Sequence, residues 1–336
     1  MSIKVGINGF GRIGRSILRI GLERGGIDFV GINDISDSKT LAHLFKYDSI
    51  FGPYKGEVKS ENGHMVIDGK PIRVFSERNP VNIPWQDVGA ELIAEASGIF
   101  RSQEEASAHL GKTVKKVIIT APAKGEVDLT TVLGANQDSY DSANHNIISN
   151  ASCTTNCFSM IVKVLHENFG IKKGQMTTVH SYTNDQQILD APHKDLRRAR
   201  AAALSIIPTS TGAATAIEII FPELKGKLSA VAMRVPTADV SVVDFTCEVE
   251  KSTTVQEINE KFKEASTGEL NGYLRYVDEE LVSSDFIGDP HSAIYDAPLT
   301  SVVEGNLVKV IGWYDNEYGY SSRVVDLIEY VGDKVK

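Results

Sequence analysis

Residues 3–14 read Ile-Lys-Val-Gly-Ile-Asn-Gly-Phe-Gly-Arg-Ile-Gly, and this stretch decides the fold of the N-terminal half of the chain. Its first six residues form a short, mainly apolar run of the length of a strand. The remainder has the spacing G-x-G-x-x-G and leads into a helical pattern with isoleucines on one face. Glycines in this context permit a tight turn and a close approach of a pyrophosphate, and the helix N-terminus attracts phosphates. The sequence therefore predicts a dinucleotide-binding turn built on Gly9, Gly11 and Gly14.

An acidic residue follows the turn at the distance that this kind of site requires. A second strand-like run, residues 28–33, ends at Asp34, which lies 20 residues beyond Gly14. A carboxylate there can accept hydrogen bonds from the adenosine ribose hydroxyls, and it would repel the 2′-phosphate of NADP. We therefore expect NAD as the cofactor.

Further strand-like runs occur at residues 91–96, 116–120 and 146–149, and helical segments alternate with them. This alternation indicates parallel pairing of the strands. The fold class is therefore α/β, with a Rossmann-type, doubly wound parallel sheet over residues 1–151.

The bulk composition fits two soluble domains and excludes several function classes. The chain has 336 residues, 42% hydrophobic and 24% charged, with a formal net charge of −9. That charge argues against nucleic acid or an anionic membrane as the main partner. No signal peptide and no long apolar run is present, so we expect a cytoplasmic protein. Three cysteines without metal-ligand spacing predict neither a disulfide framework nor a metal site.

The second informative stretch, residues 149–157, reads Ser-Asn-Ala-Ser-Cys-Thr-Thr-Asn-Cys. It precedes a helical pattern with Phe158, Ile161, Val162, Leu165 and Phe169 on one face and Gly170 as a stop signal. Cys153 then falls in the first turn, where unpaired backbone N–H groups and the helix dipole favour a thiolate. Cys153 is therefore the candidate nucleophile, whereas Cys157 and Cys247 are expected to be packing residues.

The same nine residues match, without a break, the active-site signature of the phosphorylating glyceraldehyde-3-phosphate dehydrogenases. The chain resembles the bacterial type of this family over essentially its whole length. The resemblance implies a glycolytic NAD-dependent enzyme that works as a homotetramer through a cysteine thioester. It also implies an α+β catalytic domain with a mostly antiparallel sheet at residues 152–316, and a C-terminal helix, 317–336, that packs back on the NAD domain.

The resemblance assigns a base and further cofactor contacts. Residues 177–185, Thr-Thr-Val-His-Ser-Tyr-Thr-Asn-Asp, match the family segment whose histidine, here His180, is the partner of the cysteine. A histidine titrates near neutral pH, which suits it to take up the thiol proton and to return a proton to the substrate oxygen. On the cofactor side, the resemblance implies contacts from Arg12, Ile13, Arg78, Thr120 and Asn316.

Two phosphate sites follow from the resemblance. The C3 phosphate of glyceraldehyde 3-phosphate is expected at Thr183 and Arg234. The attacking inorganic phosphate is expected at Ser152, Thr154, Thr211 and Gly212, together with Arg198 from a long segment, 181–205, that has no regular periodicity. Hydroxyls and backbone N–H groups at a helix start, and arginine as a paired donor, suit phosphate binding. Arg197 and Arg200 are expected to serve structure.

Three alternatives remain at this point. Erythrose-4-phosphate dehydrogenases share the cysteine signature, although Pro208-Thr209-Ser210-Thr211-Gly212 argues against them. An NADP-preferring form is disfavoured by Ile35 and Pro192, but Ala191 stands where many NAD-specific relatives carry leucine. A non-enzymatic binding role would be additional to catalysis. Asp239 is a departure from the family, since many relatives have asparagine there.

Overall fold

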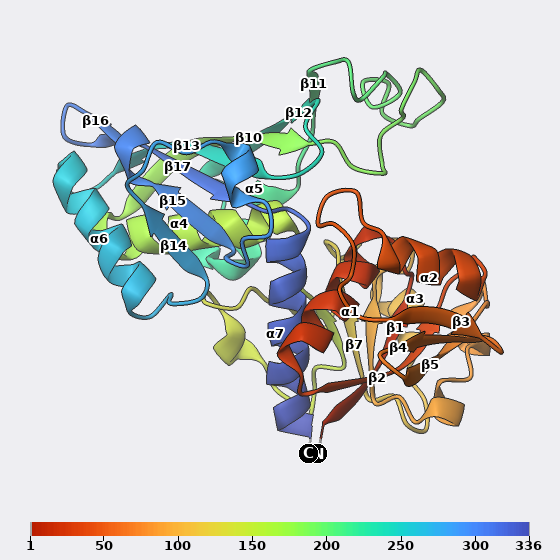
Figure 1. Cartoon of the computed structure of the whole chain (residues 1–336). Helices are drawn as coiled ribbons and strands as arrows, with labels where there is room; N and C mark the ends of the chain where they lie inside the picture. The colour runs from red at the N-terminus through yellow and green to blue at the C-terminus, as the bar shows by residue number, and fades with distance from the viewer. Residues whose placement is uncertain (1, 336) are drawn as a thin grey trace. The chain divides into compact units, whose positions relative to one another are not determined.

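The structure is a computed structural model that describes residues 2–335 (Figure 1). It divides into two compact units. Unit 1 comprises Met1–Thr131, Asp138–Ala151 and Ser321–Lys336, and unit 2 comprises Val132–Gln137 and Ser152–Tyr320. No helix among residues 2–335 has both the length and the apolar composition that a membrane crossing requires.

Unit 1 is built on a nine-stranded sheet whose order is β3-β4-β5-β2-β1-β6-β7-β9-β8. The parallel part consists of β5 (Lys70–Phe75), β2 (Ile27–Asn33), β1 (Ile3–Asn8), β6 (Leu92–Glu95), β7 (Lys116–Ile119), β9 (Ile147–Ser149) and β8 (Leu129–Thr130). The order of its strands, running outward in both directions from β1, is that of a doubly wound sheet. The expected Rossmann-type fold is therefore confirmed.

An antiparallel edge of this sheet has no counterpart in the sequence-based expectations. It is formed by β3 (Val58–Glu61) and β4 (His64–Ile67), which pair with each other and then with β5. The strands of this hairpin are only four residues long, too short for a clear alternating pattern.

The helices of unit 1 include α1 (Arg12–Arg24), α2 (Ser38–Lys46) and α3 (Gln103–Ser107), with 3-10 turns η1 (Pro80–Asn82) and η2 (Trp85–Val88). A further 3-10 turn, η3 (Gln137–Ser139), spans the boundary at which the chain passes from unit 2 back to unit 1.

Unit 2 contains an eight-stranded, mostly antiparallel sheet in the order β11-β12-β10-β13-β17-β15-β14, with β16 paired to β17. The strands are β10 (Ile171–Ser181), β11 (Ile207–Thr209), β12 (Leu228–Val235), β13 (Ser241–Val249), β14 (Leu274–Val277), β15 (Ala293–Asp296), β16 (Ser301–Val303) and β17 (Leu307–Tyr314). Two neighbouring pairs, β10–β12 and β14–β15, are parallel. The sheet class expected for this domain is confirmed.

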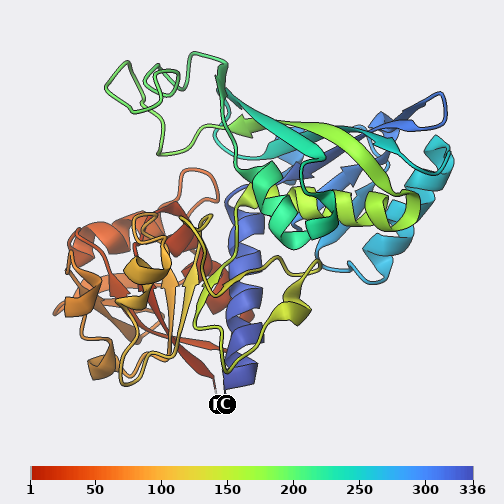
Figure 2. The same cartoon turned by 180° about the vertical axis from the view of Figure 1, so that it is seen from behind.

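Helix α4 (Cys153–Phe169) packs against β13, β15 and β17 (Figure 2). Ser152 is its N-cap and accepts a hydrogen bond from the Thr155 N–H at 3.0 Å. Gly170, with φ of 71°, ends the helix. The five apolar side chains of the expected face are all buried. Cys153 is the first residue of the helix, in the turn where it was expected. Unit 2 also contains α5 (Ala213–Ile220), α6 (Val255–Thr267) and 3-10 turns η4 (Pro222–Leu224), η5 (Ser283–Phe286) and η6 (Ala297–Leu299).

The C-terminal helix α7 (Tyr318–Val335) belongs to unit 1 from Ser321 onward. Its apolar face, Val324, Leu327, Ile328 and Val331, is buried as expected. Gly332 lies so close to β1 that an added Cβ would be 2.8 Å from the Ile3 side chain.

The unit boundaries differ slightly from the predicted ones. Residues 132–137 group with unit 2, although the sequence placed them in the first domain. The reason is packing: a Cβ on Gly134 would lie 3.1 Å from both Met160 and Tyr273, which are residues of unit 2.

Candidate active site

The glycine-rich turn between β1 and α1 has the shape that a dinucleotide requires. Gly9 has φ of 89°, and a Cβ on it would lie 2.4 Å from the backbone nitrogen of Ser97. A Cβ on Gly14 would lie 2.2 Å from the carbonyl oxygen of Gly9. Gly11, the N-cap of α1, has no atom within 4 Å of such a position. Gly9 and Gly14 are therefore required by packing, whereas Gly11 leaves open space beside the N-terminus of α1, where a phosphate can approach.

Asp34 connects the end of β2 to this turn. Its Oδ2 accepts the Phe10 N–H at 2.8 Å and its Oδ1 accepts the Ser36 N–H at 2.9 Å. The side chain is half-buried, so its carboxylate keeps further lone pairs for a ligand. This acceptor fits the ribose of NAD, since a carboxylate fixed at this position can accept from two hydroxyls.

The other predicted cofactor residues lie in different settings. Arg12 forms an ion pair with Asp48 and lies over the Phe51 ring, and Ile13 is half-buried in the first turn of α1. Arg78 is exposed after β5, and the Thr120 hydroxyl donates to the Glu95 carbonyl at 3.1 Å. Asn316 belongs to unit 2, is buried, and accepts from the Ser241 hydroxyl at 2.8 Å.

In unit 2 the structure brings Cys153 and His180 into contact. The Cys153 Sγ lies 3.5 Å from His180 Nε2. Cys153 begins α4, whereas His180 comes from the end of β10, and the parallel register of β10 with β12 sets Arg234 directly beside His180. Three segments that are distant in the sequence therefore meet at one thiol.

The hydrogen bonds assign the tautomer of His180. Its Nδ1 lies 2.7 Å from the Ser181 carbonyl, and Arg234 Nη1 donates to the same carbonyl at 3.0 Å. A carbonyl oxygen has two lone pairs, so it can accept from both the Nδ1–H and the guanidinium. Arg234 Nη1 also lies 2.9 Å from Nδ1 itself. The 2.7 Å contact with the carbonyl requires a proton on Nδ1, since two acceptors would repel each other at this distance. In this tautomer the Nε2 lone pair faces the thiol of Cys153.

Burial acts on both members of this pair. It raises the pKa of the Cys153 thiol, although the Arg234 charge and the Thr154 N–H oppose the rise. Burial, followed by the Arg234 charge, lowers the pKa of His180 to about 3. Desolvation therefore opposes the effect of the helix N-terminus, which by itself favours a thiolate, and both shifts favour the neutral forms.

Sequence reasoning missed Tyr314, the last residue of β17. Its side chain is fully buried, and its hydroxyl bonds to Thr154 Oγ1 at 2.8 Å and to Thr178 Oγ1 at 2.9 Å. Its ring lies 5.9 Å from the His180 ring, nearly edge-on. Tyr314 thus fixes the start of α4 against β10. The only available signal was that a buried tyrosine hydroxyl needs a partner.

The residues predicted for inorganic phosphate already have partners within the protein. Ser152 Oγ caps α4, Thr154 Oγ1 bonds Tyr314, and Thr211 Oγ1 accepts from the Ala213 N–H at 3.3 Å. Gly212 is exposed as the N-cap of α5.

Arg198 holds the long segment between β10 and β11 against β11. It forms an ion pair with Asp185, its Nε donates to Thr209 Oγ1 at 3.0 Å, and its Nη2 donates to the Ser210 carbonyl at 3.3 Å. Arg200 forms a more exposed pair with Asp190 at 3.1 Å.

The two residues predicted for the C3 phosphate are both half-buried. Thr183 is half-buried at the start of the long segment. The Nε of Arg234 is buried and has no hydrogen-bond partner, so the guanidinium has a donor in reserve. An unpartnered buried donor of this kind fits an anionic ligand.

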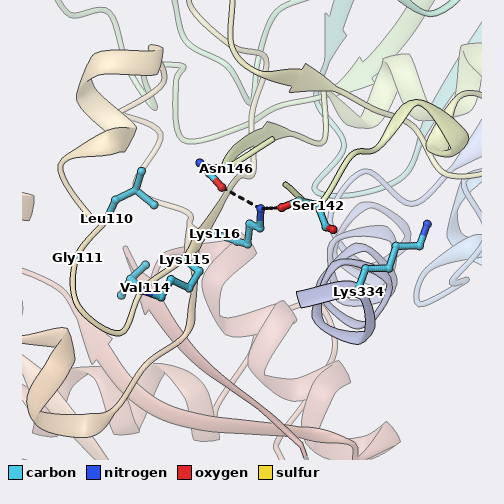
Figure 3. Close-up of a pocket in the computed structure, with 8 residues that line it drawn as sticks. All are labelled: Leu110, Gly111, Val114, Lys115, Lys116, Ser142, Asn146 and Lys334. Carbon is cyan, nitrogen blue, oxygen red and sulfur yellow. Dashed lines mark hydrogen bonds between the residues drawn. The ribbon is translucent and has the colours of Figure 1, made fainter. Parts of the chain in front are cut away.

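A cavity of about 550 Å³ in unit 1 contains none of the predicted site residues (Figure 3). Its lining includes Lys115, Lys116 and Lys334. The Lys116 ammonium donates three hydrogen bonds, to Ser142 O at 2.5 Å, His145 O at 2.8 Å and Asn146 Oδ1 at 2.9 Å. These bonds stabilise the turn before β9. With all three donors in use, this lysine serves the fold.

A doubly wound unit with a glycine-rich turn, together with a unit that places a cysteine thiol beside a histidine, is typical of NAD-dependent oxidoreductases. Residues 3–103 match the family model described as glyceraldehyde 3-phosphate dehydrogenase, NAD binding domain, and residues 152–316 match that of the C-terminal domain. The chain belongs to the glyceraldehyde-3-phosphate dehydrogenase family.

Bacterial relatives are similar over their whole length. Glyceraldehyde-3-phosphate dehydrogenase 1 of Bacillus cereus is 56% identical over 331 residues, which cover 98% of this chain and 99% of the relative. Glyceraldehyde-3-phosphate dehydrogenase of Geobacillus stearothermophilus is 56% identical over 334 residues, 99% of each chain. Glyceraldehyde-3-phosphate dehydrogenase 2 of Streptomyces avermitilis is 54% identical over all 336 residues of both.

Proposed function

We propose that the protein oxidises D-glyceraldehyde 3-phosphate with NAD and inorganic phosphate, giving 1,3-bisphosphoglycerate and NADH through a thioester on Cys153. The observation that carries this proposal is the contact of Cys153 Sγ with His180 Nε2 beside the half-buried Arg234. Relatives at 54–56% identity over the full chain bear the name of this activity, which supports the same assignment.

The residues of unit 2 supply the acid–base and covalent steps. The Cys153 thiol adds to the aldehyde carbon as its proton passes to His180 Nε2, and the new C–S bond makes a hemithioacetal. His180, now charged, and the Cys153 N–H at the start of α4 stabilise the oxygen. His180 then gives its proton to this oxygen, which makes the hydroxyl of the hemithioacetal and leaves the imidazole neutral. Loss of hydride from the former aldehyde carbon, with return of the hydroxyl proton to His180, leaves the thioester.

NAD, when bound, supplies the acceptor for that hydride. We propose that Gly9, Gly11, Gly14 and Asp34 hold its adenosine and pyrophosphate part, with Arg12, Ile13, Arg78 and Thr120 around it and Asn316 on the nicotinamide carboxamide. The open space beside Gly11 supports binding of the pyrophosphate at this turn.

Two anion sites complete the proposal. The C3 phosphate binds to Thr183 and to Arg234, whose Nε lacks a partner. Inorganic phosphate binds to Ser152, Thr154, Thr211, Gly212 and Arg198. An oxygen of this phosphate attacks the thioester carbon, the C–S bond breaks, and His180 returns a proton to the leaving thiolate. Phosphate must compete with Asp185 for Arg198, since that carboxylate already pairs with it.

Steady-state kinetics test the reaction and its alternatives in one set of assays. We expect turnover with glyceraldehyde 3-phosphate and NAD that requires phosphate, and much lower kcat/KM with erythrose 4-phosphate or with NADP. Equal turnover with and without phosphate would contradict a phosphorylating enzyme. A preference for erythrose 4-phosphate would favour the alternative dehydrogenase, and a preference for NADP would reverse the argument from Asp34.

We also propose a cytoplasmic homotetramer. The long segment between β10 and β11, which extends beyond the strands in Figure 1, exposes Ile188, Leu189, Leu196, Leu204 and Ile206 by 70–84% each. Aliphatic side chains gathered in this way are typical of a surface covered by another subunit. Light scattering of the purified protein should give four times the chain mass of 36.6 kDa, and a monomer would contradict the proposal.

A further inference from the structure

Two carboxyl groups in unit 2, Asp239 and Asp315, are buried together but are bound unequally. They are 5% and 1% exposed. Asp315 Oδ2 accepts the Gly288 N–H at 2.7 Å, and its Oδ1 accepts the Glu317 and Tyr318 N–H groups at 2.9 and 2.6 Å. Both oxygens of Asp239 are buried, and neither has a hydrogen-bond partner of normal geometry. Burial raises the pKa of both carboxyl groups. At Asp315 three backbone N–H groups oppose this rise, whereas at Asp239 only the Val240 N–H does, so Asp315 is the group that ionises more readily.

The charged groups that face this pair make a second negative charge unfavourable. Asp315 and Glu317 are the charges that act on Asp239, and both are acidic. On the segment that carries Gly288, Asp289 is paired with Arg275 and contacts His291, so the Arg275 charge is matched. Two ionised carboxylates are acceptors only and cannot bond each other, but a single proton between them gives one good hydrogen bond.

The turn next to Asp239 is strained. Val240 has φ of 65°, a left-handed conformation that a β-branched residue rarely adopts, and it is buried. Such a residue persists only where its surroundings hold it in place.

This strained turn contacts both halves of the proposed chemistry. The Val240 carbonyl accepts from Ser181 Oγ at 2.7 Å, and Ser181 carries the carbonyl that orients His180. The next residue, Ser241, accepts the Ser181 N–H at 3.1 Å and donates through its hydroxyl to Asn316 Oδ1 at 2.8 Å. A shift of the turn would therefore move Ser181 and Asn316 together.

We propose that Asp239 is a positioning residue that keeps a proton at neutral pH, donates it in a hydrogen bond to Asp315, and thereby holds the Val240 turn against Ser181 and Asn316. Loss of this proton places two anions in one buried space and releases the turn. The effect on catalysis rests on the proposed function, because it requires Asn316 to contact the cofactor. The shared proton itself does not.

The sign of the pH dependence follows from the direction of the shift. Burial, followed by the Asp315 and Glu317 charges, raises the pKa of Asp239 to about 9 from the ordinary 3.8. The folded protein therefore holds a proton that the unfolded chain releases above about pH 4. The stabilisation is complete below the unfolded pKa, declines as the pH rises, and is lost above about pH 9.

Urea unfolding of the wild type and of Asp239→Asn, measured from pH 6 to 9, tests the proton directly. Asparagine keeps a donor of the same shape and does not titrate. The folding equilibrium constant of the wild type should fall, relative to that of the variant, by up to tenfold per pH unit. Asp244→Asn is the control, since Asp244 pairs with Lys309 at 2.7 Å on a more exposed part of β13, and it should keep the wild-type slope. Parallel curves for wild type and Asp239→Asn overturn the proposal.

Kinetics test the positioning effect. The KM for NAD of the wild type should rise severalfold and reversibly from pH 8 to 9.5, while that of Asp239→Asn stays flat. Asp239→Ala, which has no donor, should have the raised KM at every pH, and rescue by asparagine but not by alanine is expected. Identical pH profiles of KM in wild type and Asp239→Asn overturn the positioning role. Absence of phosphate-dependent turnover in the wild type would contradict the proposed function instead, and the unfolding measurement does not depend on that outcome.

Discussion

The glycine-rich turn of unit 1 and the thiol centre of unit 2 are built in opposite ways. Gly9, Gly11 and Gly14 lie within six residues of each other, and the constraints on them come mainly from the local turn and the strands beside it. The thiol centre joins Cys153, His180, Arg234 and Tyr314, which sheet register and helix packing bring together. A local site tolerates changes elsewhere in the fold, whereas an assembled site depends on several elements at once.

The largest effect is expected at the assembled site, in Cys153→Ser. A serine hydroxyl does not ionise near neutral pH and transfers its proton to His180 far less readily than a thiol does, so phosphorylating turnover should fall by at least about a thousandfold. The fold and NAD binding should persist, as measured by circular dichroism and by fluorescence titration with NAD. The matched control is Cys157→Ser, one helical turn further on, where the buried thiol faces the Gly312 carbonyl. Near-normal turnover of the Cys153 variant would show that Cys153 is not the nucleophile.

Next in size is the contrast between two glycines of the local site. Gly9→Ala must accommodate both a positive φ and a Cβ 2.4 Å from the Ser97 nitrogen, so we expect a loss of roughly 3 kcal/mol or more of unfolding free energy. Gly11→Ala meets open space and should cost less than about 1 kcal/mol, yet it should weaken NAD binding about tenfold or more. Thermal unfolding and NAD titration of both variants separate the two effects. Equal stability losses would show that the two glycines are not specialised in this way.

Arg198→Ala tests whether the phosphate site is part of the assembled centre. Loss of one charged donor removes on the order of 1.5–3 kcal/mol, so thioester cleavage should slow by about 10- to 150-fold. In rapid mixing, a burst of NADH close to one per active site should remain, followed by a slow, phosphate-dependent phase. Arg200→Ala is the control, because its pair with Asp190 is exposed and should contribute little. If the burst vanished while the phosphate dependence stayed unchanged, Arg198 would instead act in aldehyde binding, or its ion pair with Asp185 would stabilise the segment between β10 and β11.

The smallest effect is expected in cofactor choice. The wild type should prefer NAD over NADP by at least ~10-fold in kcat/KM, roughly 1.4 kcal/mol. Asp34→Ala should narrow this ratio, because it removes both the acceptor for the ribose hydroxyls and the repulsion of the 2′-phosphate. Asp34→Asn separates these two effects, since an amide still accepts from the Phe10 and Ser36 N–H groups without a negative charge. Equal use of both cofactors by the wild type would contradict the preference inferred from Asp34, and Ala191 would then be the suspected cause.

Much of the fold could be predicted because its signals are local. The strand at residues 3–8 has the predicted bounds, and the strands predicted at 28–33, 116–120 and 146–149 agree with the structure to within one residue at each end. The buried face of α4 follows the predicted periodicity. The short hairpin β3–β4 was not predicted, because four-residue strands carry little pattern. The site residues and their roles remain predictions, drawn from a family signature that the sequence contains without a break.

The sequence by itself determined the fold class, the glycine-rich turn with its acidic partner, the position of Cys153 at a helix start and membership of a dehydrogenase family. These follow from the spacing of residues along the chain, which a sequence shows directly. Only the tertiary structure decided the direction of the pKa shifts in the thiol pair, the participation of Tyr314 and the burial of Asp239 beside Asp315. Burial and the partners that strand register supplies set these properties. Desolvation, for example, outweighs the helix N-terminus at Cys153, and the extent of desolvation depends on residues from distant parts of the chain.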